Sequence, residues 1–194
     1  AAGAILLVSL LQESHRLAFH DELTGLPGRR ALQESLSGLG PAYTIAMVDV
    51  DHFKQFNDTH GHDVGDQVLK LVAARLAQIQ GGGTAYRHGG EEFAVLFPER
   101  SLDDALLHLE RMRREIETYR MAVRSVDRPK DPEAGSKRRA AGATERQPDK
   151  MLSVTVSIGA AQRTDALTNP SLVLQASDQA MYRAKRAGRN RVSR

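Results

Sequence analysis

The chain has 194 residues, of which 41% are hydrophobic, enough to bury the core of one domain of ordinary size. It contains no cysteine, which excludes disulfides, zinc–thiolate sites and cysteine nucleophiles and leaves oxygen and imidazole as metal ligands. The formal net charge of +3 is compatible with a polyanionic partner but is too small to identify one.

The first 20 residues are expected to form a helix that leads in from an upstream segment. Residues 1–11 are apolar apart from Ser9, and the sequence then turns polar within a helical pattern. This apolar stretch is too short to span a bilayer, which takes roughly 20 residues. It is interpreted as the end of a transmembrane helix or as part of a dimerising helix, with a frayed terminus as the plain alternative.

Residues 21–50 predict a turn, a helix and a buried strand. Residues 21–30 are rich in turn formers, and a helix is expected to follow to about Leu36. Residues 43–50 (YTIAMVDV) are almost continuously apolar, which is typical of a strand buried on both faces. Asp49 is therefore expected to emerge at the edge of the sheet.

A dense polar cluster follows this strand. It contains acids, histidines, a lysine and an asparagine, namely Asp49, Asp51, His52, Lys54, Asn57, Asp58, His60, His62, Asp63 and Asp66. Such a cluster directly after a buried strand indicates a functional site. From about Val64 to Ile79 apolar residues recur at helical spacing, so this helix is expected to pack one face inward.

Residues 87–97 (RHGGEEFAVLF) predict a β-hairpin that presents carboxylates at the head of its second strand. Gly89 and Gly90 suit a tight turn, because both central residues of its favoured form need positive φ. Glu91 and Glu92 come next, before an apolar run rich in strand formers. The plain alternative is an ordinary surface turn with solvated acids.

The second half of the chain alternates helices and strands. Ser101 and Asp104 resemble a capping box, and the helix that they begin extends over about 102–116. Residues 121–150 carry three prolines and no aromatic residue, so a flexible insertion is expected there. Residues 152–158 alternate apolar and polar side chains, as in a half-buried strand.

A last helix is predicted between Asn169, a good N-cap, and Gly188, a good stop. The full order of elements predicts an α/β fold in which helices cover a mixed sheet.

The distribution of acids and bases favours metal-dependent chemistry on a nucleotide. Hard oxygen ligands from Asp49, Glu91 and Glu92 suit Mg²⁺ that is shared with substrate phosphates. The residues able to balance phosphate charge are Lys54, Lys185 and Arg189, and those able to read a purine edge are Asn57 and Asp66. From these residues alone, a surface rich in solvated charge stays open as an alternative.

Five segments together resemble the GGDEF family of diguanylate cyclases, in its GGEEF form. They are DELTGLPGRR, DVDHFKQFNDTHGHDVGDQVL, RHGGEEFAVLF, TVSIGAA and DQAMYRAKRAGRNR, in the family's order. The resemblance implies a mixed central sheet surrounded by helices, similar to nucleotidyl cyclases and polymerase palms. Residues 21–194 would then be the catalytic domain, interrupted by the insertion, and residues 1–20 the lead-in helix.

The resemblance implies the condensation of two GTP molecules into cyclic di-GMP, with release of two pyrophosphates. Each subunit of a homodimer would hold one GTP, and the 3′-hydroxyl of one GTP would attack the α-phosphate of the other. The implied cofactor is Mg²⁺, or Mn²⁺ in its place, with two ions per GTP. The implied setting is a cytoplasmic output domain of a bacterial signalling protein, with an inner-membrane anchor only through sequence upstream of the chain.

The resemblance also implies residue roles. Glu91 would deprotonate the 3′-hydroxyl, and Lys54 would stabilise the charged transition state. The implied metal ligands are Asp49, the Val50 carbonyl, Glu91 and Glu92. The implied substrate-binding residues are Phe53, Asn57, His62, Asp66, Lys185 and Arg189, with Asn57 and Asp66 reading guanine and Lys185 and Arg189 binding phosphate.

The chain departs from the family pattern before the glycines. Many members carry an inhibitory product site there, Arg-x-x-Asp, whereas this chain has Gln80 and Gly83 at those positions. Without the guanidinium fork, no feedback inhibition through this site is expected. The insertion at 121–150 is longer than usual, and Gly28 stands where the family commonly has Asn.

The leading interpretation is an active diguanylate cyclase. The main alternative is a catalytically idle module of a larger signalling protein that binds GTP or dimerises. Nucleic-acid binding is not expected, because only 5% of residues are aromatic and no basic stripe is interleaved with aromatic side chains.

Overall fold

The computed structural model describes residues 18–123 and 150–194. The larger compact unit comprises the described residues up to Glu117 and from Val154 onward, and the smaller unit comprises those between them. Within the described residues, no helix combines the length and the apolar character that crossing a membrane requires.

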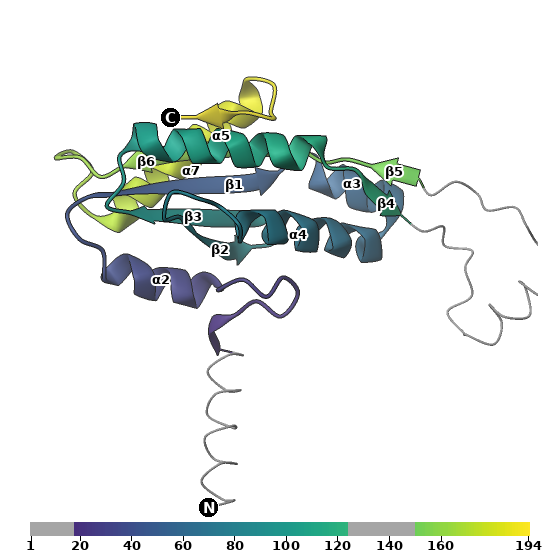
Figure 1. Cartoon of the computed structure of the whole chain (residues 1–194), viewed down its shortest axis with the longest axis horizontal. Helices are drawn as coiled ribbons and strands as arrows, with labels where there is room; N and C mark the ends of the chain where they lie inside the picture. Colours follow the sequence, from purple (N-terminus) through teal and green to yellow (C-terminus); the bar gives the residue numbers. More distant parts are fainter. Residues whose placement is uncertain (1–17, 124–149) are drawn as a thin grey trace, which may run out of the picture. The chain divides into compact units, whose positions relative to one another are not determined.

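The larger unit is built on a five-stranded sheet with β1 in its centre (Figure 1). The strands, in spatial order, are β2 (Thr84–Gly89), β3 (Glu92–Pro98), β1 (Tyr43–Val50), β6 (Val156–Gln162) and β7 (Val192–Ser193). Neighbours are antiparallel except for the parallel pair β6–β7. Every residue of β1 is buried, as its continuous apolar sequence predicted, and the predicted mixed sheet is confirmed.

Five helices pack around this sheet in the described part of the chain. They are α2 (Arg29–Ser37), α3 (Phe53–His60), α4 (His62–Leu76), α5 (Leu102–Thr118) and α7 (Pro170–Arg186). The predicted caps are present, since Ser101 Oγ accepts from Asp104 N at 3.2 Å and Asn169 Oδ1 accepts from Leu172 N at 3.0 Å. The expected α/β fold is therefore confirmed.

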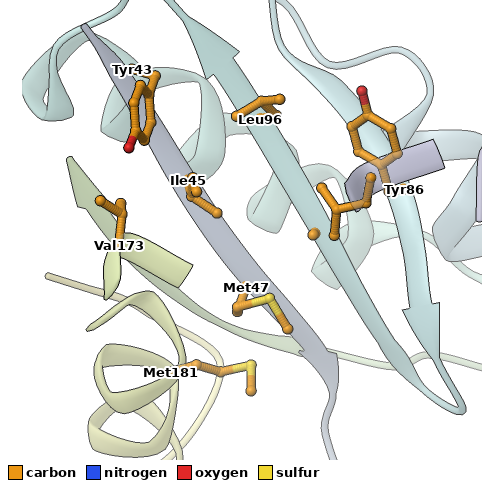
Figure 2. Close-up of a cluster of buried hydrophobic side chains, with 9 residues drawn as sticks. Tyr43, Ile45, Met47, Tyr86, Leu96, Val173 and Met181 are labelled. Atoms are coloured by element: carbon orange, nitrogen blue, oxygen red, sulfur yellow. The ribbon is translucent and has the colours of Figure 1, made fainter. Parts of the chain in front are cut away.

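Helices α2 and α7 cover one face of the sheet. Figure 2 shows Val173 and Met181 of α7 on the same side of β1 as Ile45 and Met47. At Gly159 of β6 an added Cβ would lie 1.9 Å from the backbone nitrogen of Met181, so only glycine permits this approach.

The opposite face of the sheet is buried as well. Alternate residues of β1 and β3, such as Val48 and Phe93, are fully buried, and α4 and α5 each bury an apolar stripe that supplies the cover. The charged residues of β1 and β3 are Asp49 and Glu92, and both lie at an end of their strand, where the helices do not cover the sheet.

One helix was not predicted, and one strand was predicted wrongly. The polar cluster after β1, for which no secondary structure was predicted, contains helix α3. The strand predicted at 152–158 begins at Val156, and its first five residues are all buried, because helices lie on both sides of it. Leu152 belongs to β5 instead.

The smaller unit contains an antiparallel pair, β4 (Met121–Val123) and β5 (Lys150–Leu152). These strands lie at the two ends of the segment predicted to be a flexible insertion, and residues 124–149 of that segment lie outside the described residues. Of the predicted lead-in helix, residues 1–17 also lie outside them, and Ala18 and Phe19 are helical.

Candidate active site

Asp49 lies at the end of the central strand, where the two neighbouring strands place polar groups beside it. Its register partners are Glu92 on β3 and Ser157 on β6. Lys185, in the last turn of α7, places its Nζ 2.7 Å from Asp49 Oδ2. Asp49, at the end of β1, is therefore only 4% exposed, and its carboxylate is already paired with the ammonium of Lys185.

The hairpin turn differs from its prediction in one detail. Gly89 pairs with Glu92, so the two residues at the tip of the turn are Gly90 and Glu91 rather than the two glycines. Gly90 has a φ of 53°, which explains the need for glycine, whereas Glu91 has no positive φ. This arrangement places Glu91 at the tip and Glu92 at the start of β3.

Arg87 fixes this turn to the segment that precedes α2. Its Nε and Nη2 donate to the Gly90 carbonyl at 3.2 and 2.8 Å, and its Nη1 donates to Asp21 Oδ1 at 2.7 Å. Thr24 also donates to Asp21, from its backbone N and its hydroxyl. Burial acts to raise the pKa of Asp21, but the hydrogen bonds from Thr24 and Arg87 outweigh it and lower the pKa.

A cavity of about 330 Å³ opens between the end of β1, the hairpin tip and the C-terminal end of α7. Seven of the predicted site residues line it, namely Asp49, Val50, Phe53, Lys54, Glu91, Lys185 and Arg189. They come from three separate stretches of the sequence, 49–54, 91 and 185–189. The structure therefore brings the predicted catalytic and phosphate residues and all the predicted metal ligands except Glu92 to one cavity.

The oxygen groups at this cavity fit a divalent cation. Burial raises the pKa of Asp49 to about 6; the ammonium of Lys185 opposes the rise, and the carboxylates of Glu91 and Glu92 add to it. Lys185 Nζ thus stands in for a counter-cation of the Asp49 carboxylate. Nowhere in residues 18–123 and 150–194 are three acidic or histidine side chains gathered closely enough to hold a metal by themselves.

The predicted guanine-binding residues lie on the α3–α4 pair and do not line this cavity. Asn57 of α3 packs against Gly65 of α4, where an added Cβ would lie 1.8 Å from Asn57 Oδ1. That oxygen is buried and has no hydrogen-bond partner among the described residues. Asp66 follows Gly65 and His62 begins α4, and both are exposed.

A second cavity, of about 510 Å³, lies on the other side of Lys185. Glu92 lines this cavity and not the first one, together with Lys185 and the exposed Tyr182. Lys185 therefore lines both cavities. Glu91 lines the first cavity, and its neighbour Glu92 lines the second.

The positions of the family's product site are occupied by other contacts. Gln80 Oε1 accepts a hydrogen bond from Arg111 Nη1 at 3.2 Å. At Gly83 an added Cβ would lie 2.6 Å from the ring of Phe97, so an aspartate would not fit there without displacing that ring.

Asp51 is a residue of this region whose role the sequence did not reveal. It is 6% exposed and accepts three hydrogen bonds, from Thr155, Ser157 and the backbone of Asn190. Those partners lie more than 100 residues away in the chain, so no local spacing could have identified them.

Comparison with known sequences identifies relatives along most of the chain. The family model described as "Diguanylate cyclase, GGDEF domain" matches residues 18–137 and 133–191. The response regulator PleD of Caulobacter vibrioides is 36% identical over 190 residues, which cover 94% of this chain and 37% of PleD. Diguanylate cyclase VdcA of Vibrio cholerae is 36% identical over 198 residues, which cover 98% of this chain and 52% of VdcA. The chain thus spans between about a third and a half of these curated relatives.

A solved structure shows the same fold. The coiled coil and GGDEF domain of DgcB from Caulobacter crescentus, in complex with c-di-GMP, matches with a TM-score of 0.81 at 31% identity. The match covers 99% of this chain and 93% of that one.

Proposed function

Since the chain belongs to the GGDEF family of diguanylate cyclases, we propose that it condenses two molecules of GTP into cyclic di-GMP and two pyrophosphates. The observation that carries the proposal is the cavity at the end of β1, where carboxylates from a strand end and a hairpin tip meet basic side chains from α3, α7 and the loop after α7. Opposite charges converging on one cavity suit an anionic substrate and a cation together.

Glu91 is proposed as the general base. In each half-reaction the 3′-oxygen of one GTP bonds to the α-phosphorus of the other, the bond to pyrophosphate breaks, and the proton of the hydroxyl passes to Glu91. The tip of the hairpin suits this task, because the incoming hydroxyl belongs to a nucleotide held by a second subunit. Lys54, on the same cavity, is proposed to stabilise the negative charge that develops at phosphorus.

Lys185 and Arg189 are proposed to bind the triphosphate, with Phe53 as a further substrate contact from the cavity wall. Asn57 is proposed to read the guanine edge with Asp66, and His62 to contact the nucleotide nearby. The unpartnered Asn57 oxygen supports this, because a buried acceptor without a hydrogen bond is costly and a guanine N–H would satisfy it.

The GGDEF family generally uses a divalent metal. The groups proposed to hold it here are Asp49, the Val50 carbonyl, Glu91 and Glu92, with Mg²⁺, or Mn²⁺ in its place, and two ions per GTP. When bound, such an ion polarises phosphate oxygens as a Lewis acid and neutralises their charge. A homodimer is proposed as the active form, because each subunit supplies one GTP to the reaction.

The test is turnover of GTP with Mg²⁺, with cyclic di-GMP quantified by mass spectrometry over a range of protein concentrations. The wild type is expected to form product at a rate that rises faster than linearly with concentration. Glu91→Gln should lose at least about 100-fold in rate, as expected for removal of a general base. The control Glu34→Gln changes an exposed glutamate of α2 and should match the wild type.

Equal rates for Glu91→Gln and wild type would overturn the assignment of the base. GTP binding without product in any sample would favour the idle GTP-binding or dimerisation module instead.

A further inference from the structure

Asp51 is only two residues from Asp49, yet its carboxylate is fully engaged within the protein. Its Oδ1 accepts from the Ser157 hydroxyl at 2.6 Å. Its Oδ2 accepts from the Thr155 hydroxyl at 2.7 Å and from the backbone N–H of Asn190 at 3.0 Å. A carboxylate that already satisfies three donors is a structural anchor rather than a free ligand.

The bond to Asn190 matters because of the backbone it holds. Gly188, Arg189 and Asn190 all have positive φ, of 111°, 63° and 47°. Asparagine tolerates this conformation, but it is unfavourable for arginine and persists there only when surrounding contacts enforce it. On one side the enforcing contact is Arg189 N–H to the Ala184 carbonyl, at 3.0 Å. On the other side it is Asp51.

The side chain of Asn190 is fixed as well, by α5. Its Nδ2 donates to Glu117 Oε1 at 2.7 Å, and its Oδ1 accepts from Arg113 Nη1. Arg113 is itself buried and paired with Glu110 at 2.8 Å and with Glu117 at 2.9 Å. The residue that follows Arg189 is therefore anchored through both its backbone and its side chain.

Arg189 contrasts with this anchored neighbour. Its guanidinium has no hydrogen-bond or ion-pair partner within the described part of the chain, and the residue lines the cavity that contains Asp49 and Glu91. A rigid backbone that carries an unpaired guanidinium is the arrangement expected of a preorganised phosphate ligand.

We propose that Asp51 is a positioning residue, which holds the left-handed backbone at 188–190 so that Arg189 faces the substrate phosphates. The proposal rests on the assignment of Arg189 to the triphosphate. An asparagine at position 51 distinguishes this role from a metal-ligand role, because an amide can replace the hydrogen bonds of the carboxylate but not its negative charge at a metal. In Asp51→Asn the amide oxygen can still accept from Asn190 and Thr155, and the amide N–H₂ can donate to the Ser157 hydroxyl.

The experiment measures equilibrium binding of GTP by calorimetry and the thermal midpoint of the same samples. Asp51→Ala and Arg189→Ala are each expected to weaken GTP binding about tenfold, the loss typical of one charge-assisted contact. The double variant should bind no more weakly than Arg189→Ala alone, because Asp51 acts through that residue. Asp51→Asn should stay within about threefold of the wild type.

The matched control is Thr155→Val, which removes one hydrogen bond to Asp51 without touching the backbone of Asn190. It should lower the thermal midpoint and leave GTP affinity within about threefold of wild type. If Asp51→Ala does not fold, Asp51→Ser takes its place, since its hydroxyl is one bond shorter than the carboxylate and falls short of the Asn190 N–H, and it should weaken GTP binding by about the same factor.

Three results from the variants would overturn the proposal. The first is wild-type affinity in the folded Asp51→Ala variant, or in Asp51→Ser where it is used. The second is losses that multiply in the double variant, and the third is an Asp51→Asn variant as weak as Asp51→Ala, which would indicate a metal ligand. Absence of GTP binding by the wild type would overturn it too. Normal GTP binding without cyclic di-GMP would refute the proposed function alone, because the binding comparison does not depend on turnover.

Discussion

The cavity at the end of β1 and the contact between α3 and α4 are built in opposite ways. In the cavity the buried carboxylate already has a partner, since Asp49 and Lys185 are paired at 2.7 Å. Between α3 and α4 an amide oxygen of Asn57 is held against Gly65 with no partner among the described residues. The proposed reaction chemistry thus depends on the ends of strands, whereas the proposed base recognition depends on how closely α3 and α4 pack.

The largest effect is expected from neutralising the carboxylate at the strand end. Asp49→Asn should reduce the rate of cyclic di-GMP formation by at least about 100-fold, because it removes a proposed metal ligand. The control Asp165→Asn, on an exposed loop, should leave the rate unchanged. A rate within a few-fold of the wild type, measured at saturating Mg²⁺ and GTP, would show that the cavity is not the reaction centre.

The same substitution should stabilise the metal-free protein at neutral pH. Burial raises the pKa of Asp49 from 3.8 to about 6, so the folded state binds the proton more tightly than the unfolded state. The contribution of Asp49 to stability must then fall as pH rises from about 4 to about 6, by about 2 to 3 kcal/mol.

Urea unfolding in the presence of EDTA would measure this pH dependence of stability. The free energy of unfolding of the wild type, minus that of Asp49→Asn, should decrease across this pH window and be constant above it. A difference that does not change with pH would mean that Lys185 fully compensates the burial of the carboxylate.

A smaller effect is expected at the helix pair. In Gly65→Ala the new methyl group would occupy the position of Asn57 Oδ1, so Asn57 must move. KM for GTP should rise about tenfold, and the preference for GTP over ATP should fall, with kcat changing less. Gly40→Ala is the control, because no atom lies within 4 Å of its added Cβ. Unchanged nucleotide preference in Gly65→Ala would separate Asn57 from guanine recognition.

The smallest effect is expected outside both regions. Added cyclic di-GMP should not inhibit the initial rate through the positions of Gln80 and Gly83, because the guanidinium and carboxylate of the family's product site are missing there. Micromolar inhibition that disappears in Gln80→Ala would contradict this.

The strand that carries Asp49 could be predicted because a continuous apolar run that ends in an acid leaves few alternatives. Helix α3 was missed because seven of its eight residues are not buried, and Phe53 is the one buried position that fixes it to the core. Strand β6 was given the wrong start and the wrong exposure because its alternation of apolar and polar residues looks half-buried, while Ser157 is in fact buried and bonded to Asp51.

The site, like the fold, could be predicted only in part. Residue types and motif order predicted which side chains meet at the cavity. They gave a role to Asp49 and none to Asp51, because the hydrogen-bond partners of Asp51 come from distant segments. They also could not show that Asn57 and Asp66 lie apart from the cavity, since that depends on the packing of α3 against α4.

The ion pair between Lys185 and Asp49 has a consequence for the order in which ligands bind. Binding of Mg²⁺ alone would displace the Lys185 ammonium from Asp49 and leave the ammonium without an anionic partner. A triphosphate bound with the metal would provide the ammonium with a new anionic partner. We therefore expect weak affinity for the metal alone and strong affinity for the metal–nucleotide complex. We expect Lys185 to act as the counter-ion of Asp49 until the metal–nucleotide complex binds.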